Sequence, residues 1–144
     1  MVDTENPKNI AANFIQEIWN EQNFSLLENF LHPAFADHSL PPAFPENKEG
    51  LKRWIITTSQ SFIHRTFIEE QVTEGNKTIL KIKMELKHIG TWRNIEPTGK
   101  EISVIGYRYF QFENNKIIAH WGLLDGNAIE NLLKQTFNSC KLQN

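Results

Sequence analysis

Near the carboxyl end of the chain, a carboxylate follows an apolar strand. The segment Lys116–Leu124 has the composition of a β-strand, and Asp125 comes directly after it, where a helix is predicted to begin. Strand alternation places Trp121, Leu123 and Asp125 on one face. A carboxylate that is buried there tends to have a raised pKa, which suits proton transfer near neutral pH. Asp125 is therefore a candidate catalytic acid/base.

A histidine occupies a position that the alternation assigns to the interior. In the strand before the loop 89–99, the residues Leu80, Ile82, Met84 and Leu86 share one face, and the next member of that face is His88. In the strand that precedes Lys116, a second face carries Tyr107, Tyr109 and Gln111. A hairpin at Asn114-Asn115 would bring that face to the same side as Trp121. Polar and aromatic groups mixed on one face predict the lining of a cavity.

Each of these residues also has a purely structural interpretation. Asp125 at a strand end before a helix is equally suited to be an N-cap that accepts hydrogen bonds from free amides. His88 alone is more often a hydrogen-bonded core histidine than a catalyst. Arg108 and His120 alternate away from the predicted cavity, so they are expected at the surface or in an interface. The indoles of Trp19 and Trp54 lie on helical faces and are core residues by default.

The spacing of apolar residues changes from helical to alternating halfway along the chain. Helical spacing of apolar residues predicts helices over residues 9–19, 24–31 and 47–62. Asn6-Pro7 marks the start of the first helix, and Pro33 ends the second. His32 and His64 are expected at the ends of the second and third helices. Residues 34–40 are a candidate short strand before a proline-rich loop. Turns at Gly75-Asn76 and Asn114-Asn115 then separate alternating strands, and a short helix is expected over residues 127–137. Helices followed by an antiparallel meander indicate an α+β fold.

Composition excludes several classes of protein. With 144 residues, 40% of them hydrophobic, and a net charge of -2, the chain suits a single domain spanning 1–144, and no basic face points to nucleic acid. The only cysteine, Cys140, has no partner for an internal disulfide, and no His/Cys spacing predicts a metal site. Without an apolar span or a leader pattern, the chain is expected to be soluble and cytoplasmic. Residues 1–8 and 138–144 are expected to be frayed tails.

Four stretches together resemble the SnoaL-like polyketide cyclase, or ester cyclase, family within the nuclear transport factor 2-like superfamily. They are "LHPAFADHS", "KHIGTW" with His88, "PTGKEISVIGYRYFQF", and "KIIAHWGLLD" with Trp121 and Asp125. They match in order and spacing over residues 31–135. The resemblance implies a cone-shaped fold, with three N-terminal helices packed on a curved, mostly antiparallel sheet around a central pocket.

The resemblance also implies a chemistry. Characterised members of the family close polyketide rings by an intramolecular aldol reaction, without metal or organic cofactor. Asp125 would then be the acid/base, with His88 as the second catalytic residue. The residues expected to contact the substrate are His38, Tyr109, Gln111, Trp121, Trp92 and Trp54.

Three functions remain open at this point. The first is a cofactor-free cyclase-type enzyme that acts on a small hydrophobic carbonyl or ester compound, or an isomerase or hydrolase of the same fold. The second is a small-molecule-binding module without turnover, and the third is an interaction protein that uses the open face of the sheet. Outward-facing Ile89, Ile105 and Ile117 predict a homodimer through the sheet.

Overall fold

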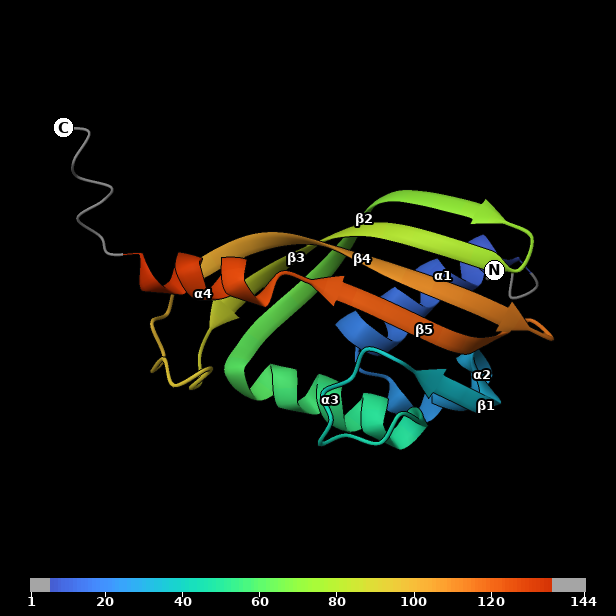
Figure 1. The fold of residues 1–144 in the computed structure, drawn as a ribbon, viewed down its shortest axis with the longest axis horizontal. Helices are drawn as coiled ribbons and strands as arrows, with labels where there is room; N and C mark the ends of the chain where they lie inside the picture. Colours follow the sequence, from blue (N-terminus) through green and yellow to red (C-terminus); the bar gives the residue numbers. More distant parts are fainter. Residues whose placement is uncertain (1–5, 136–144) are drawn as a thin grey trace.

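A curved five-stranded sheet with helices packed on its concave face makes up the fold (Figure 1). The computed structural model describes residues 6–135. The elements in chain order are α1 (Pro7–Phe14), the π-helix η1 (Ile15–Asn20), the 3-10 helix η2 (Phe24–Leu26), α2 (Leu27–Phe30), β1 (Leu31–Asp37), α3 (Lys48–Ser61), β2 (Phe62–Glu74), β3 (Lys77–His88), β4 (Glu101–Glu113), β5 (Lys116–Leu124) and α4 (Gly126–Lys134). The predicted α+β class is confirmed.

Helix boundaries follow capping residues in the sequence. α1 begins at Pro7 after Asn6, whose side chain accepts a hydrogen bond from the Lys8 amide, as the Asn-Pro pair predicts. Asn47 caps α3 in the same way by accepting from the amide of Gly50. The expected tails 1–8 and 138–144 lie outside the described residues except for residues 6–8, where Asn6 caps α1 and Pro7 and Lys8 belong to it.

Two boundary predictions are wrong. The expected second helix ends at Phe30, and the following residues form β1 from Leu31, so His32 lies in a strand. α3 ends at Ser61, which places His64 in β2 rather than at a helix end. In both places hydrogen bonding to a neighbouring strand outweighs the local helical pattern, because β1 pairs with β5 and β2 pairs with β3.

The strands lie in the order β1-β5-β4-β3-β2, and only β1 and β5 run parallel. The mostly antiparallel sheet and both hairpin turns are thereby confirmed. Asn114 and Asn115 both have positive φ (52° and 61°), which matches the right-handed twist of a two-residue hairpin. Asn is among the few non-glycine residues that tolerate this conformation.

Register decides which residues of β4 and β5 face the concave side. The inward residues Leu80 and Ile82 of β3 pair directly with Arg108 and Gly106, and cross-strand partners share a face. Even-numbered residues of β4 therefore face inward. A bulge at residue 118 shifts the register of β5, so that His120 lies opposite Phe110 and is buried.

Tyr109 and Trp121 share a face, as expected from the sequence, because the bulge makes them cross-strand partners, but their shared face is the outer one. The sequence interpretation assigned the cavity to this face, and the register overturns that assignment. The core lies on the opposite side, between the concave face of the sheet and the helices α1, η1 and α3. No helix within residues 6–135 is both long and apolar enough to cross a membrane.

Candidate active site

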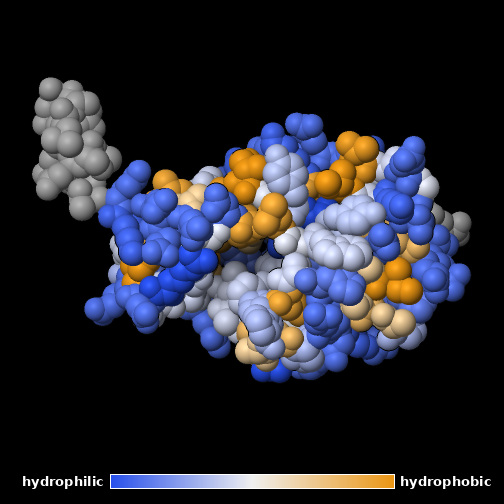
Figure 2. All heavy atoms as spheres, in the orientation of Figure 1, coloured by the Kyte–Doolittle hydropathy of each residue, from blue (hydrophilic) through white to orange (hydrophobic). Residues whose placement is uncertain are grey.

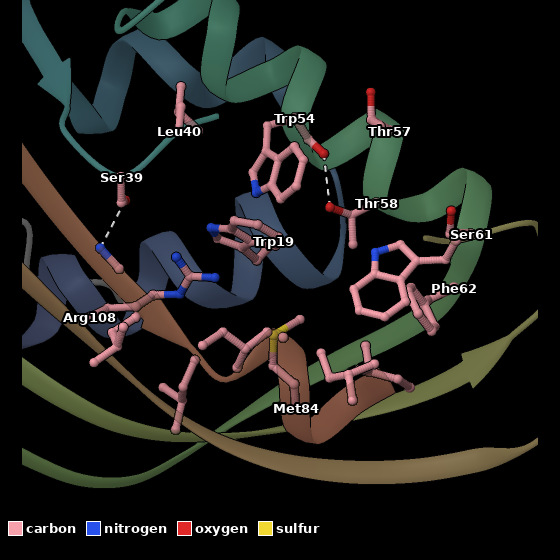
Figure 3. A pocket seen from close by; sticks show the side chains of 18 of the residues that line it. Trp19, Ser39, Leu40, Trp54, Thr57, Thr58, Ser61, Phe62, Met84 and Arg108 are labelled. Atoms are coloured by element: carbon pink, nitrogen blue, oxygen red, sulfur yellow. Dashed lines mark hydrogen bonds between the residues drawn. The ribbon is translucent and has the colours of Figure 1, made fainter. Parts of the chain in front are cut away.

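A cavity of about 380 Å³ lies between the concave face of the sheet and α3. Met84 of β3 lies across the cavity from Thr58 of α3 (Figure 3). Ile82 and Leu86 of β3 and Thr57 of α3 also line it. It also has three indoles in its lining, those of Trp19, Trp54 and Trp92. Figure 2 shows a hollow near the centre of the visible face, beside the end of β5. The size and the apolar walls suit a small, largely hydrophobic molecule.

One end of the cavity is polar, and a chain of hydrogen bonds runs through it. The Asp37 carboxylate accepts from the backbone amide of Ser39 at 2.9 Å and from the Ser39 hydroxyl at 2.6 Å. Its second oxygen lies 2.9 Å from Nδ1 of His120. Nε2 of His120 lies 3.4 Å from Nη1 of Arg108. An acid, an imidazole and a guanidinium are thus connected in series.

The electrostatics fix the protonation of this chain. Burial alone would raise the pKa of Asp37, but hydrogen bonds from His120 and Ser39 outweigh it and lower that pKa. Burial lowers the pKa of His120, against the opposing effect of its hydrogen bond to Asp37. Burial also lowers the pKa of Arg108 to about 10, with the charge of Asp37 acting in the other direction. At neutral pH the series is therefore carboxylate, neutral imidazole and guanidinium cation.

The tautomer of His120 follows from its neighbours. An ionised carboxylate can only accept a hydrogen bond, so Nδ1 of His120 carries the proton that faces Asp37. The Arg108 guanidinium can only donate, so Nε2 of His120 is unprotonated and its lone pair accepts from Nη1 of Arg108. This is the arrangement that prepares an imidazole to act as a base at Nε2.

Gly122 lies between the cavity and His120, which is itself buried. A Cβ on Gly122, which lines the cavity, would lie 3.1 Å from Cε1 of His120, 3.0 Å from Nη1 of Arg108 and 3.4 Å from Oγ of Ser39. The space that a side chain would fill is therefore bordered by these three groups. The Gly122 amide also donates to the Ser39 hydroxyl at 2.9 Å, which fixes that hydroxyl toward Asp37.

Trp19 reaches the cavity from a π-helix. The wider turns of η1 continue α1 to Asn20, whose side chain pairs with both backbone groups of Thr66 on β2. Single π-turns within helices are frequently found at functional sites. The Trp19 ring centroid lies 4.3 Å from Cζ of Arg108, a stacked cation–π contact.

Asp125 does not open into this cavity. It is exposed and caps α4, where its carboxylate accepts a hydrogen bond from the amide of Ala128 at 2.9 Å. The prediction that its carboxylate faces an apolar cavity is wrong, and the N-cap interpretation that the sequence left open is correct. The bulge at residue 118 is the physical cause, because it directs Leu124 and Gly122 inward and Asp125 outward. A catalytic role for Asp125 stays a prediction.

His88 is buried, as the alternation predicts, with 0% exposure. Its Nδ1 accepts from the backbone amide of Thr98 at 3.1 Å, so the proton is on Nε2, which has no partner among residues 6–135. The ring packs on Phe62 at a centroid distance of 5.3 Å. These contacts join the loop 89–100 to the end of β3, next to the cavity.

The predicted substrate-binding residues divide into two groups. Trp54 and Trp92 line the cavity. His38, Tyr109, Gln111 and Trp121 instead form a cluster on the outer face. There His38 stacks on Trp121 at 4.6 Å, and the amide of Gln111 donates to the Tyr109 hydroxyl. None of the four lines this cavity: the pairing of β4 with β3 puts Tyr109 and Gln111 on the outer face, and the bulge in β5 puts Trp121 there. Their contact with a substrate stays a prediction.

Sequence reasoning missed Asp37, Arg108 and His120. Arg108 and His120 were expected at the surface, yet they are 8% and 2% exposed. One signal was available: Val104, Phe110 and Phe112 alternate with Arg108 on the same face of β4, and that face is the more apolar of the two. Asp37 carries no local signal, because it contacts His120 through the pairing of two strands that lie far apart in sequence. Within residues 6–135, no group of three His, Cys, Asp or Glu side chains is arranged to hold a metal ion.

A curved sheet and helices that enclose a pocket with a polar end define an α+β protein with an internal cavity. The family model for SnoaL-like polyketide cyclases matches residues 9–133, and the chain belongs to that family. No curated protein matches the chain in sequence.

Solved structures have the same fold at low identity. IdmH from Streptomyces antibioticus is 19% identical, with a TM-score of 0.79 over 90% of this chain and 99% of its own. TsrD from Streptomyces laurentii is 21% identical, with a TM-score of 0.77 over 88% and 93%. A SnoaL-like polyketide cyclase from Agrobacterium tumefaciens is 18% identical, with a TM-score of 0.73 over 88% and 97%.

Proposed function

We propose that this protein is a cofactor-free, cyclase-type enzyme that acts by acid/base chemistry on a small hydrophobic carbonyl or ester compound. The observation that carries the proposal is a largely apolar cavity whose polar end is lined by Asp37 and Arg108, with His120 hydrogen-bonded between them. Membership in the SnoaL-like family supports ring closure of the aldol type as the reaction.

The proposed acid/base is His120 rather than Asp125. Nε2 of His120 would take a proton from the carbon next to a substrate carbonyl, and Asp37 would stabilise the imidazolium that forms. Arg108 would donate to the enolate oxygen in place of Nε2 of His120, which leaves that lone pair available for the proton. The enolate carbon would then attack a second carbonyl of the same molecule, and the resulting alkoxide would recover the proton from His120. The cavity walls contribute by holding the substrate in a folded, reactive shape.

Deuterium exchange tests the acid/base assignment without knowledge of the substrate. The probe is 2-acetylnaphthalene in deuterated buffer, and NMR follows the loss of its methyl protons next to the carbonyl. We expect the wild-type chain to accelerate exchange and His120→Asn to reduce the acceleration by about 100-fold or more, the usual contribution of a general base. Asn keeps a donor toward Asp37 but has no basic nitrogen.

Asp125→Asn is the matched control, because the amide oxygen can still cap α4. Its exchange rate is expected to stay within about twofold of wild type, since the side chain lies outside the cavity. If Asp125→Asn loses exchange while His120→Asn retains it, Asp125 is the acid/base after all. If the wild-type chain does not accelerate exchange, the second candidate function holds. That candidate is a binding module, which the capping position of Asp125 favours.

A homodimer through the outer face of the sheet is proposed as well. Ile79, Ile105, Tyr107, Trp121 and Leu123 lie on that face and are 38–72% exposed. The expectation that Ile117 faces outward is wrong, because it is buried with 0% exposure. Several large apolar side chains exposed on one face of a sheet mark a candidate interaction site, and a stable dimer buries roughly 800 Å² per partner. Light scattering at micromolar concentration should give the mass of a dimer for the wild type.

Leu123→Lys should shift that mass toward a monomer, because it places a cation in the contact. Ile56→Lys is the control, since Ile56 is also exposed (39%) but lies on α3, which packs on the concave face. A monomeric wild type, or equal dissociation by both variants, would exclude this interface.

A further inference from the structure

Arg108 is a buried cation without a carboxylate against it. Its side chain forms no ion pair among the described residues, and its Nε has no hydrogen-bond partner there. The contact of Nη1 with His120 is long, at 3.4 Å. Asp37 is separated from the guanidinium by the imidazole. A buried guanidinium is usually paired directly, because desolvating the charge is expensive.

Trp19 provides a second unused donor in the same place. Its indole Nε1 is buried and has no partner within residues 6–135. In Figure 3 the Arg108 guanidinium and the indole nitrogens of Trp19 and Trp54 point toward the same end of the cavity. An indole N–H and a guanidinium can only donate, so this end offers several donors.

The acceptors at this end are already occupied. One oxygen of Asp37 accepts twice from Ser39, and the other accepts from His120. The Ser39 hydroxyl gives its proton to Asp37 and accepts from the Gly122 amide. Unsatisfied donors beside satisfied acceptors define a site that is complete only when a ligand brings an acceptor.

We propose that the polar end of the cavity is an oxyanion subsite, and that the ligand is a flat apolar molecule that carries a carboxylate or an ionised enol. The planar guanidinium fork matches a delocalised oxyanion, and the hydrogen bonds gain strength from the charge on both partners. The three indoles and the β3 side chains would contact the apolar body. The inference rests on the proposed function only in taking this cavity as the ligand site.

Binding of a matched pair of probes tests the subsite. 2-Naphthoate and 2-naphthamide have nearly the same shape, and only the first is an anion. Calorimetric titration of the wild-type chain at neutral pH should give a Kd for naphthoate about tenfold or more below that for naphthamide. Equal affinities, or no binding of naphthoate at millimolar concentration, would overturn the proposal.

Three variants identify the source of the preference. Arg108→Met keeps the apolar stem and should abolish the preference for the anion. Trp19→Phe keeps an aromatic ring but removes the N–H and part of the indole. It should weaken the binding of naphthoate several-fold and the binding of naphthamide less. Arg65→Met removes an exposed cation on β2 and should change neither Kd. A preference that survives both Arg108→Met and Trp19→Phe would assign those residues to packing alone.

The outcome is separable from that of the exchange assay. A preference for the anion without acceleration of exchange supports the proposed subsite and contradicts the proposed enzymatic function. Acceleration of exchange without a preference for the anion supports the proposed enzymatic function and contradicts the proposed subsite.

Discussion

Asp37→Ala is expected to lower the free energy of unfolding by about 3–5 kcal/mol at neutral pH, because it removes one partner of a buried charged network. The carboxylate is 1% exposed and accepts hydrogen bonds from two groups of Ser39 and from His120. Without it, these donors lose their acceptor, and the Arg108 cation is left without a compensating charge. Urea denaturation followed by tryptophan fluorescence measures the loss.

Asp125→Ala is the matched control, since it truncates the same side chain at an exposed position. Loss of an N-cap hydrogen bond costs about 1 kcal/mol. The difference between the two losses of unfolding free energy therefore measures how much more the buried network contributes than an exposed cap. Equal losses for both would mean that the Asp37 network contributes no more to stability than a surface cap.

The contribution of Asp37 should also depend on pH in a defined direction. Because its pKa is lowered in the folded state, the stabilisation is fully present above the unfolded value of about 3.9 and is lost as the pH falls through the folded value. The difference between wild type and Asp37→Ala should therefore be constant from about pH 5 to 6 and shrink below about pH 4.

The β-meander could be predicted from sequence because its signals are local. Gly75 and the pair Asn114-Asn115 mark turns, and the alternation from Leu80 to His88 identifies a buried face. These features depend on neighbours within a few residues, and the structure confirms them. The same local reasoning placed Trp54 on the helix that lines the cavity.

The polar site could not be predicted in this way, because its parts are brought together by register. One additional residue in the bulge at residue 118 exchanges the two faces of β5, which moves His120 inward and Asp125 outward. Arg108 was expected at the surface or in an interface because it alternates away from Tyr107 and Tyr109, whose face the sequence interpretation assigned to the cavity. Arginine is rarely buried, so the burial of Arg108 is the feature that identifies the site.

The segment "KHIGTW" illustrates a different limit of sequence reasoning. Its residue types point to chemistry at His88, but its glycine has a structural explanation that only the fold reveals. A Cβ on Gly90 would lie 2.1 Å from the backbone oxygen of Gln60 and 3.2 Å from Cα of Ser61. The amides of residues 89 and 90 both donate to the Ser61 carbonyl, which holds the loop 89–100 against the end of α3.

Gly90→Ala is therefore expected to destabilise the fold by about 3 kcal/mol, at the upper end of the usual cost of overpacking, because a backbone atom cannot rotate away as a side chain can. The loop must then move, together with Trp92 in the cavity wall and Thr98 on His88. Urea denaturation measures the stability, and the binding of 2-naphthamide reports the shape of the cavity.

Gly75→Ala is the control for this last expectation. Gly75 has a positive φ of 58° but nothing within 4 Å of an added Cβ, so its cost is only the strain of a left-handed residue, roughly 1–2 kcal/mol, with no effect on binding. If Gly90→Ala is no less stable than Gly75→Ala and binds naphthamide like the wild type, the loop does not depend on the contact with α3. A larger loss at Gly90 together with weaker binding would mean that the glycine of this segment serves the cavity by allowing two backbones to touch.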